Sequence, residues 1–163
     1  YNYTGDGDFG FRKFADEGNM CRLFIQDYYG EDILYMIHCF EKNLPLLFLG
    51  NKCLISHAEP KIPYSRNELI DARMLGSVVE GLTWTENDAA QEGSVVATIK
   101  NLTGLEDCGD YVYLGGHRPV NGNYKLRQNG LYIQFHNPGL QNVAIVKSEK
   151  KFNPNLDIVE VAK

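Results

Sequence analysis

The chain has 163 residues, a formal net charge of −5 and a pI of about 5.3. Apolar residues make up 44 % and charged residues 23 %, which is typical of a folded globular protein rather than a disordered one. The acidic balance argues against binding of nucleic acid through its phosphates. No apolar run approaches the roughly 20 residues of a membrane helix. The four cysteines include no C-x-x-C pair, and we expect a cytoplasmic protein without a membrane partner.

The first quarter of the chain is predicted to be helical, over residues 11–43. Residues 1–10 are rich in glycine and aspartate and predict a loop. A calcium loop starting at Asp6 is rejected, because its sixth position is phenylalanine instead of glycine. Apolar spacing predicts one helix over 12–29, with an interruption at Gly18, and a second over 31–43 with an apolar stripe.

The remaining residues, 44–163, are predicted to be rich in strands. Two apolar runs, 46–50 and 52–56, flank a short turn and predict a hairpin. Residues 61–92 are predicted to hold polar loops and a helix near 66–75, and 93–106 to form another helix. The last third contains five segments with strand composition, separated by Asn-Gly and Pro-Gly turns: 110–115, 123–130, 131–137, 141–149 and 156–162.

Histidines follow three of the predicted strands. His57 ends the run "CLISH", His117 ends "YLGGH", and His136 ends "LYIQFH". Loops just beyond strand ends are where ligands bind in layered α/β proteins, and neutral imidazole is a common metal ligand. Gly115 and Gly116 would let the backbone approach such a ligand closely. The alternative is a metal-free α/β domain in which these histidines are incidental, His136 lying in a tight Asn-Pro-Gly turn.

The order of the motifs resembles the second half of the calcineurin-like metallophosphoesterases, in particular the Ser/Thr protein phosphatase branch. The resemblance rests on "LPLLF…NKCLISHAEP", "GLTWTEND", "YVYLGGHRPV" and "LYIQFHNPGLQNVAIV", over roughly residues 40–147. It implies an α/β (α+β) fold, as part of a β-sandwich flanked by helices. It also implies metal-dependent hydrolysis of phosphate esters.

By this resemblance, His57 and His117 would be ligands of the second of two divalent metal ions, Mn, Fe or Zn. The family's upstream motifs, Asp-x-His, Gly-Asp-x-x-Asp and Gly-Asn-His, are absent. Residues 1–163 are therefore expected to be either one domain or the C-terminal portion of a metallophosphoesterase domain. A chain with only half of the metal ligands would be inactive by itself, and no catalytic residue is assigned within it.

Departures from the family pattern affect the expected substrate. Where the family has His-Gly-Gly, this chain has His57-Ala58-Glu59, which is expected to put a carboxylate near the metals. The family's phosphate-binding arginine has no counterpart, and Arg118 or Arg66 could replace it. His136 and Asn137 complete the predicted substrate-binding residues.

Several functions and partners remain open at this point. The phosphorylated substrate could be a protein, a nucleotide or an RNA end. The chain could instead be a non-catalytic, phosphatase-like binding module. Strands without their neighbours would expose edges, so the predicted partners are the missing N-terminal half or a second copy of the chain.

Overall fold

The structure is a computed structural model that describes residues 16–161. The loop predicted over 1–10, the start of the first predicted helix and most of the rejected calcium loop lie outside these residues. The described residues form a mixed α/β fold, with a five-stranded sheet, a separate two-stranded sheet and six α-helices.

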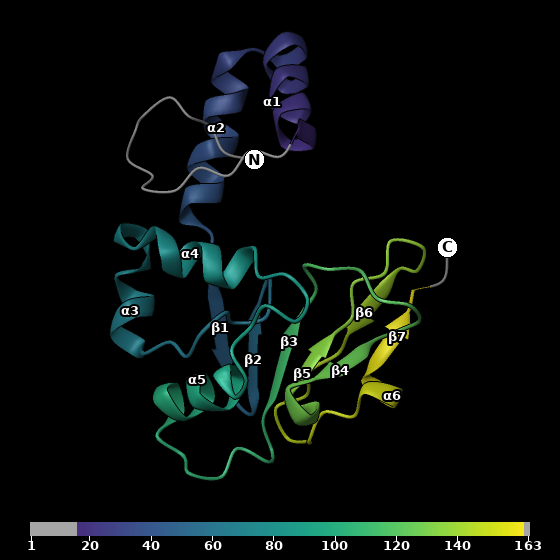
Figure 1. Ribbon diagram of the computed structural model, residues 1–163. Helices are drawn as coiled ribbons and strands as arrows, with labels where there is room; N and C mark the ends of the chain where they lie inside the picture. Colours follow the sequence, from purple (N-terminus) through teal and green to yellow (C-terminus); the bar gives the residue numbers. More distant parts are fainter. Residues whose placement is uncertain (1–15, 162–163) are drawn as a thin grey trace.

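Two helices, α1 (Asp16–Tyr29) and α2 (Glu31–Asn43), form a hairpin that stands apart from the sheets (Figure 1). The chain reverses between them at Gly30, whose φ of 86° favours glycine. α1 runs through the expected interruption at Gly18 without a break. No helix among the described residues is long and apolar enough to cross a membrane.

The apolar stripe predicted for α2 is only partly buried. Leu34 is buried, but Ile33 is 40 % and Phe40 67 % exposed. The helical spacing therefore predicted the helix correctly, and much of its apolar stripe is exposed.

The five-stranded sheet has the strand order β1-β2-β3-β5-β4. The predicted hairpin is confirmed, because β1 and β2 pair antiparallel around the turn. β2, β3 and β5 run parallel in the centre, and β4 pairs antiparallel with β5 at the other edge. The strands are β1 (Leu47–Gly50), β2 (Cys53–Ser56), β3 (Val112–Gly115), β4 (Lys125–Arg127) and β5 (Tyr132–Gln134).

The two faces of this sheet are covered differently. On one face, Leu54 of β2 and two tyrosines, Tyr113 and Tyr132, pack against α5 (Ser94–Thr103). On the other face, alternate residues of the same strands pack against Ile158 of the second sheet. That sheet pairs β6 (Asn142–Ala144) with β7 (Ile158–Glu160). The central strands are consequently buried on both faces, as parallel strands usually are.

Between β2 and β3 the chain passes through several helices, and this long crossover is what permits the two strands to run parallel. Two of these helices were predicted: the helix near 66–75, here α3 (Arg66–Ile70) followed by a 3₁₀ turn, and α5.

The loop prediction for 76–83 was wrong, because these residues form helix α4. Glycine and β-branched residues lower the helix propensity there, but burial of Val78 and Leu82 stabilises the helix. These elements are α3 (Arg66–Ile70), η1 (Ala72–Met74) and α4 (Gly76–Thr83). A short η2 (Gln128–Gly130) follows β4, and α6 (Pro154–Asp157) precedes β7.

Helix α3 begins with a capping box. The Ser65 hydroxyl accepts a hydrogen bond from the Glu68 backbone N–H, and the Glu68 carboxylate accepts one from the Ser65 backbone N–H. The Ser65 hydroxyl also donates to the Glu68 carboxylate at 2.6 Å, and this bond, followed by the one from the Ser65 backbone N–H, lowers the pKa of Glu68. The cap therefore satisfies backbone donors that the helix cannot bond itself.

Replacing Ser65 with alanine is expected to lower the free energy of unfolding by about 1 kcal/mol, because a backbone N–H at the helix start loses its acceptor. Urea denaturation followed by circular dichroism measures this change. Ser148→Ala is the matched control, since Ser148 is exposed in a turn, and it should change the free energy by less than about 0.5 kcal/mol. Equal effects of the two substitutions would contradict the role of the cap.

Candidate metal and ligand site

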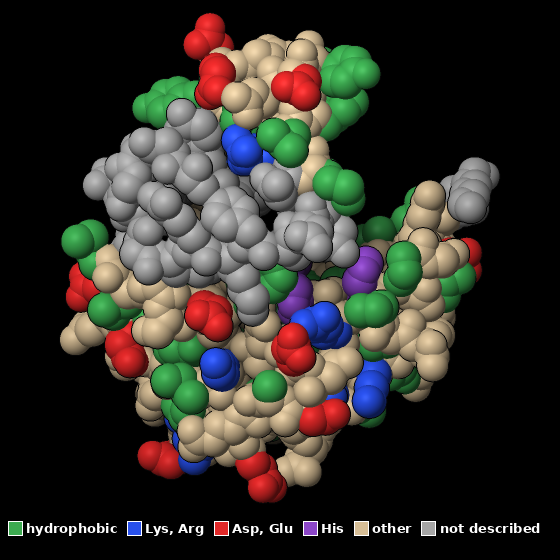
Figure 2. Space-filling view, turned by 45° about the horizontal axis from the view of Figure 1, so that its top comes forward, with side chains coloured by type: hydrophobic (Ala, Val, Ile, Leu, Met, Phe, Trp, Pro, Cys, Tyr) green, Lys and Arg blue, Asp and Glu red, His purple; other side chains and the backbone are tan. Residues whose placement is uncertain are grey.

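Three parallel strands end side by side, and a histidine follows each of them. Ile55 of β2 pairs with Leu114 of β3, and Leu114 pairs with Ile133 of β5. The carboxyl ends of the three strands therefore meet at one edge of the sheet. This register brings His57, His117 and His136 to the same end of the molecule. Figure 2 shows histidine side chains gathered near the centre of one face.

The first two histidines are in direct contact. The His57 carbonyl accepts hydrogen bonds from the backbone N–H groups of Gly116 and His117, at 3.0 and 2.8 Å. The ring nitrogens, Nε2 of His57 and Nδ1 of His117, lie 3.0 Å apart. Residues 60 positions apart in the sequence thus form one hydrogen-bonded imidazole pair.

The pKa of His57 is lowered, first by partial burial of the ring and second by the nearby charge of His136. Both effects disfavour the imidazolium form. The lowered pKa favours the neutral ring near pH 7, which is the form that binds metal ions.

Trp84 lies edge-on to His117, with ring centroids 5.4 Å apart. It ends α4, the helix that sequence analysis missed. Two backbone hydrogen bonds join this helix to the segment after His57: Ala58 N–H to the Leu82 carbonyl, at 2.8 Å, and Lys61 N–H to the Gly81 carbonyl, at 3.0 Å. The tryptophan segment is therefore held next to the histidine pair by main-chain contacts.

A cavity of about 550 Å³ opens beside His57. Its walls are formed by the three strand ends and by the loop between β5 and β6. The residues that line it are 55–57, 115–116, 135–138 and 140–142. His57 and His136 both belong to this lining, so the histidine pair and the cavity form a continuous site.

The predicted substrate-binding residues have different environments. Arg118 forms an ion pair with Glu86 at 2.7 Å, and both side chains are partly exposed. The Asn137 side chain lines the cavity, but both of its polar ends are bonded: its NH₂ group donates to the Gly122 carbonyl in the loop before β4, and its oxygen accepts from the Gly139 N–H in its own loop. His136 is exposed in the cavity lining.

Arg66, the alternative phosphate ligand, lies elsewhere. Its guanidinium donates to the Leu102 carbonyl at 2.9 Å, which anchors α3 to the end of α5. This contact assigns Arg66 a structural role and leaves Arg118 as the arginine next to the histidine pair.

The two glycines before His117 lie close to neighbouring side chains. A Cβ on Gly115 would collide with the Tyr132 ring, and a Cβ on Gly116 would lie 3.2 Å from the Cβ of His136. The backbone at these two glycines comes close to Tyr132 in β5 and to His136 just after it. The short distance between these neighbouring segments explains why residues without a side chain occupy both positions.

Gly115→Ala is expected to lower the free energy of unfolding by about 1–3 kcal/mol, because Tyr132 is buried and cannot move aside without disturbing the core. Thermal unfolding measures this loss. Gly122→Ala is not a suitable control because its φ is 81°. Gly109→Ala is preferable, since its nearest neighbour is an exposed aspartate side chain. Equal destabilisation by the two variants would contradict the packing argument.

Glu59 does not have the expected place near a metal. Its two oxygens accept hydrogen bonds from Arg127 at 2.7 Å and from Gln128 at 2.6 Å. The Arg127 and Glu59 side chains are only 9 % and 5 % exposed. Burial opposes the charge of Arg127, but the bond to Glu59 and the charges of Glu59 and Asp88 outweigh it and raise the pKa of Arg127.

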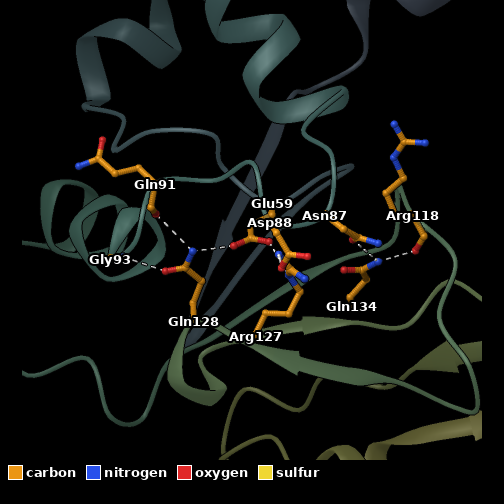
Figure 3. A network of polar contacts seen from close by, with 9 residues as sticks. All are labelled: Glu59, Asn87, Asp88, Gln91, Gly93, Arg118, Arg127, Gln128 and Gln134. Atoms are coloured by element: carbon orange, nitrogen blue, oxygen red, sulfur yellow. Dashed lines mark hydrogen bonds and ion pairs between the residues drawn. The ribbon is translucent and has the colours of Figure 1, made fainter.

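This ion pair is part of a polar network that sequence analysis did not predict (Figure 3). Arg127 also contacts Asp88 at 3.1 Å. Gln128 accepts from the Gly93 N–H, and Gln134 donates to Asn87 and to the Arg118 carbonyl. The network ties the loop after Trp84 to β4 and β5. No spacing signal in the sequence could have revealed it, because its members come from five separate segments.

Among residues 16–161, no group of three or more His, Cys, Asp or Glu side chains is placed to hold a metal ion. Comparisons with protein-family models, with curated proteins and with solved structures found no match.

Proposed function

We propose that this chain supplies two histidine ligands to a divalent metal centre that hydrolyses phosphate esters. The observation that carries the proposal is the contact between His57 and His117, at 3.0 Å, at the ends of adjacent parallel strands. Two nitrogens bound to one tetrahedral zinc ion lie about 3.3 Å apart. To bind one metal ion, the two rings would have to give up their hydrogen bond and turn so that both nitrogen lone pairs point to the ion.

The residues near the histidine pair would assist a bound metal ion in different ways. A bound metal would polarise the phosphate and lower the pKa of a bound water. The lowered pKa of His57 keeps that ring available as a ligand. Arg118 would bind a phosphate oxygen after leaving Glu86, because its ion pair is partly exposed and such pairs contribute little stability. Mn, Fe and Zn all suit imidazole ligands combined with carboxylates.

The remaining metal ligands are proposed to come from residues other than 16–161 or from a partner chain. Two histidines fall short of the four to six ligands that metal ions require. Manganese and zinc titrations of the purified chain test this half-site. We expect one weakly bound ion for each chain, and no hydrolysis of p-nitrophenyl phosphate until the missing ligands are supplied. Two tightly bound ions would contradict the half-site, and absence of binding at millimolar metal would contradict the metal centre.

A non-catalytic, phosphatase-like binding module is the second candidate. The ion pair between Arg118 and Glu86 favours it. In a catalytic centre, this guanidinium would bind the phosphate instead of a carboxylate. Hydrolysis of p-nitrophenyl phosphate in the presence of a complementing segment or partner chain separates the two candidates. Restored hydrolysis supports the enzyme, whereas metal binding without hydrolysis supports the module.

A further inference from the structure

The cavity beside His57 has the size of a small-molecule site. Its volume of about 550 Å³ lies within the range of 300–1,000 Å³ that is common for such sites. His57 and His136 line it together with the loop between β5 and β6. A phosphate ester held at the histidine pair could therefore place its organic group in this cavity.

The lining described for the cavity contains no Lys, Arg, Asp or Glu residue. A second phosphate group would require arginine or lysine partners. A charged peptide side chain would require an opposite charge, because burying an unpaired charge is costly. The chemistry of the described lining thus favours an uncharged group.

Part of the cavity wall is apolar and offers an aromatic ring. Ile55, Phe135, Pro138 and Leu140 contribute this part. A planar ring can stack on the face of an aromatic side chain, and stacking of a nucleobase is favourable for every base. A flat heteroaromatic ring suits this wall better than a flexible chain.

One side chain of the lining is available to read the edge of such a ring. Gln141 is exposed, and its carboxamide makes no hydrogen bond with another described residue. The amide of Asn137 bonds to Gly122 and Gly139, and Asn142 donates to the Asn123 carbonyl. A glutamine carboxamide presents one donor and one acceptor side by side, which matches the edge of adenine.

We propose that the cavity binds the base of a nucleoside monophosphate, with the ring against Phe135 and its edge bonded to Gln141. This inference rests on the proposed function, because the phosphate would lie at the histidine pair. The net charge of −5 favours a mononucleotide over an RNA end, since a longer nucleic acid would add further negative charge.

Metal-free binding of adenosine tests the cavity separately from the metal centre, because adenosine carries no phosphate. Isothermal titration of the whole chain should show saturable binding of adenosine. Gln141→Ala should weaken it roughly tenfold, as expected for loss of a bidentate contact to a base. Gln91→Ala is the matched control, since Gln91 is exposed outside the cavity lining, and it should leave the affinity unchanged.

Three results would overturn the inference: no binding of adenosine, equal affinities of the Gln141→Ala variant and the unchanged chain, or tighter binding of a 5′-phosphorylated oligoadenylate than of adenosine monophosphate. Circular dichroism confirms that each variant is folded. A chain that binds adenosine but no manganese keeps the base site and loses the proposed metal centre. The opposite result keeps the metal centre and rejects the base site.

Discussion

Replacement of Arg127 by methionine is expected to lower the free energy of unfolding by roughly 3–5 kcal/mol. The substitution leaves the Glu59 carboxylate buried, with Gln128 as its remaining partner in the ion-pair network. An uncompensated buried charge is the cause of the loss, rather than the missing attraction itself. Guanidinium denaturation of the variant and the unchanged chain measures the difference.

Two further variants distinguish this explanation from a simple loss of packing. The double variant Glu59→Gln/Arg127→Met removes both charges and retains the Gln128 hydrogen bond, so it should be more stable than Arg127→Met alone. Arg118→Met is the matched control, because it removes an arginine from a partly exposed ion pair. It should cost less than about 1 kcal/mol. A double variant less stable than Arg127→Met would contradict the buried-charge explanation.

Replacement of His57 or His117 by alanine is expected to abolish measurable zinc binding, because the intact pair is itself expected to bind the ion weakly and each variant keeps one of its two imidazoles. Loss of residues that only orient metal ligands already costs about 10- to 100-fold, and a ligand itself should cost more. Isothermal titration with zinc measures the affinity. Trp84, the one tryptophan of the chain, lies 5.4 Å from the His117 ring and supplies a second measurement. Quenching of its fluorescence by cobalt should disappear in both variants.

His38→Gln is the matched control for these substitutions. It removes an imidazole that lies on α2 rather than at a strand end, and it should leave the zinc affinity unchanged. If His38→Gln lowered the affinity as much as His57→Ala, the metal would be bound elsewhere. Unchanged affinity in both strand-end variants would reject the histidine pair as a metal site.

Much of the local structure could be predicted from the sequence. The apolar runs around residues 51 and 52 predicted the hairpin of β1 and β2, and strand composition predicted the five later strands. The helix over 76–83 could not be predicted, because its residues have low helix propensity and become helical through burial of Val78 and Leu82. The short helix at 154–157 was missed for a similar reason, since four residues carry no periodic pattern.

The site was partly predictable. The apolar runs before His57, His117 and His136 indicated strand ends, and the structure brings His57 into contact with His117. The role of Glu59 was predicted wrongly, because its partner Arg127 is 68 positions away in the chain. Nothing in the local sequence indicates that the Glu59 carboxylate forms a buried ion pair with Arg127.

By itself, the sequence determined which residues lie at the ends of apolar strands, because apolar runs and the turn residues that bound them are local properties of the chain. Only the tertiary structure decided that these ends meet. The long crossover through α3, α4 and α5 makes β2 and β3 parallel neighbours. Their register then places the ring nitrogens of His57 and His117 3.0 Å apart. Strand order and register depend on packing between distant segments, and no local pattern encodes them.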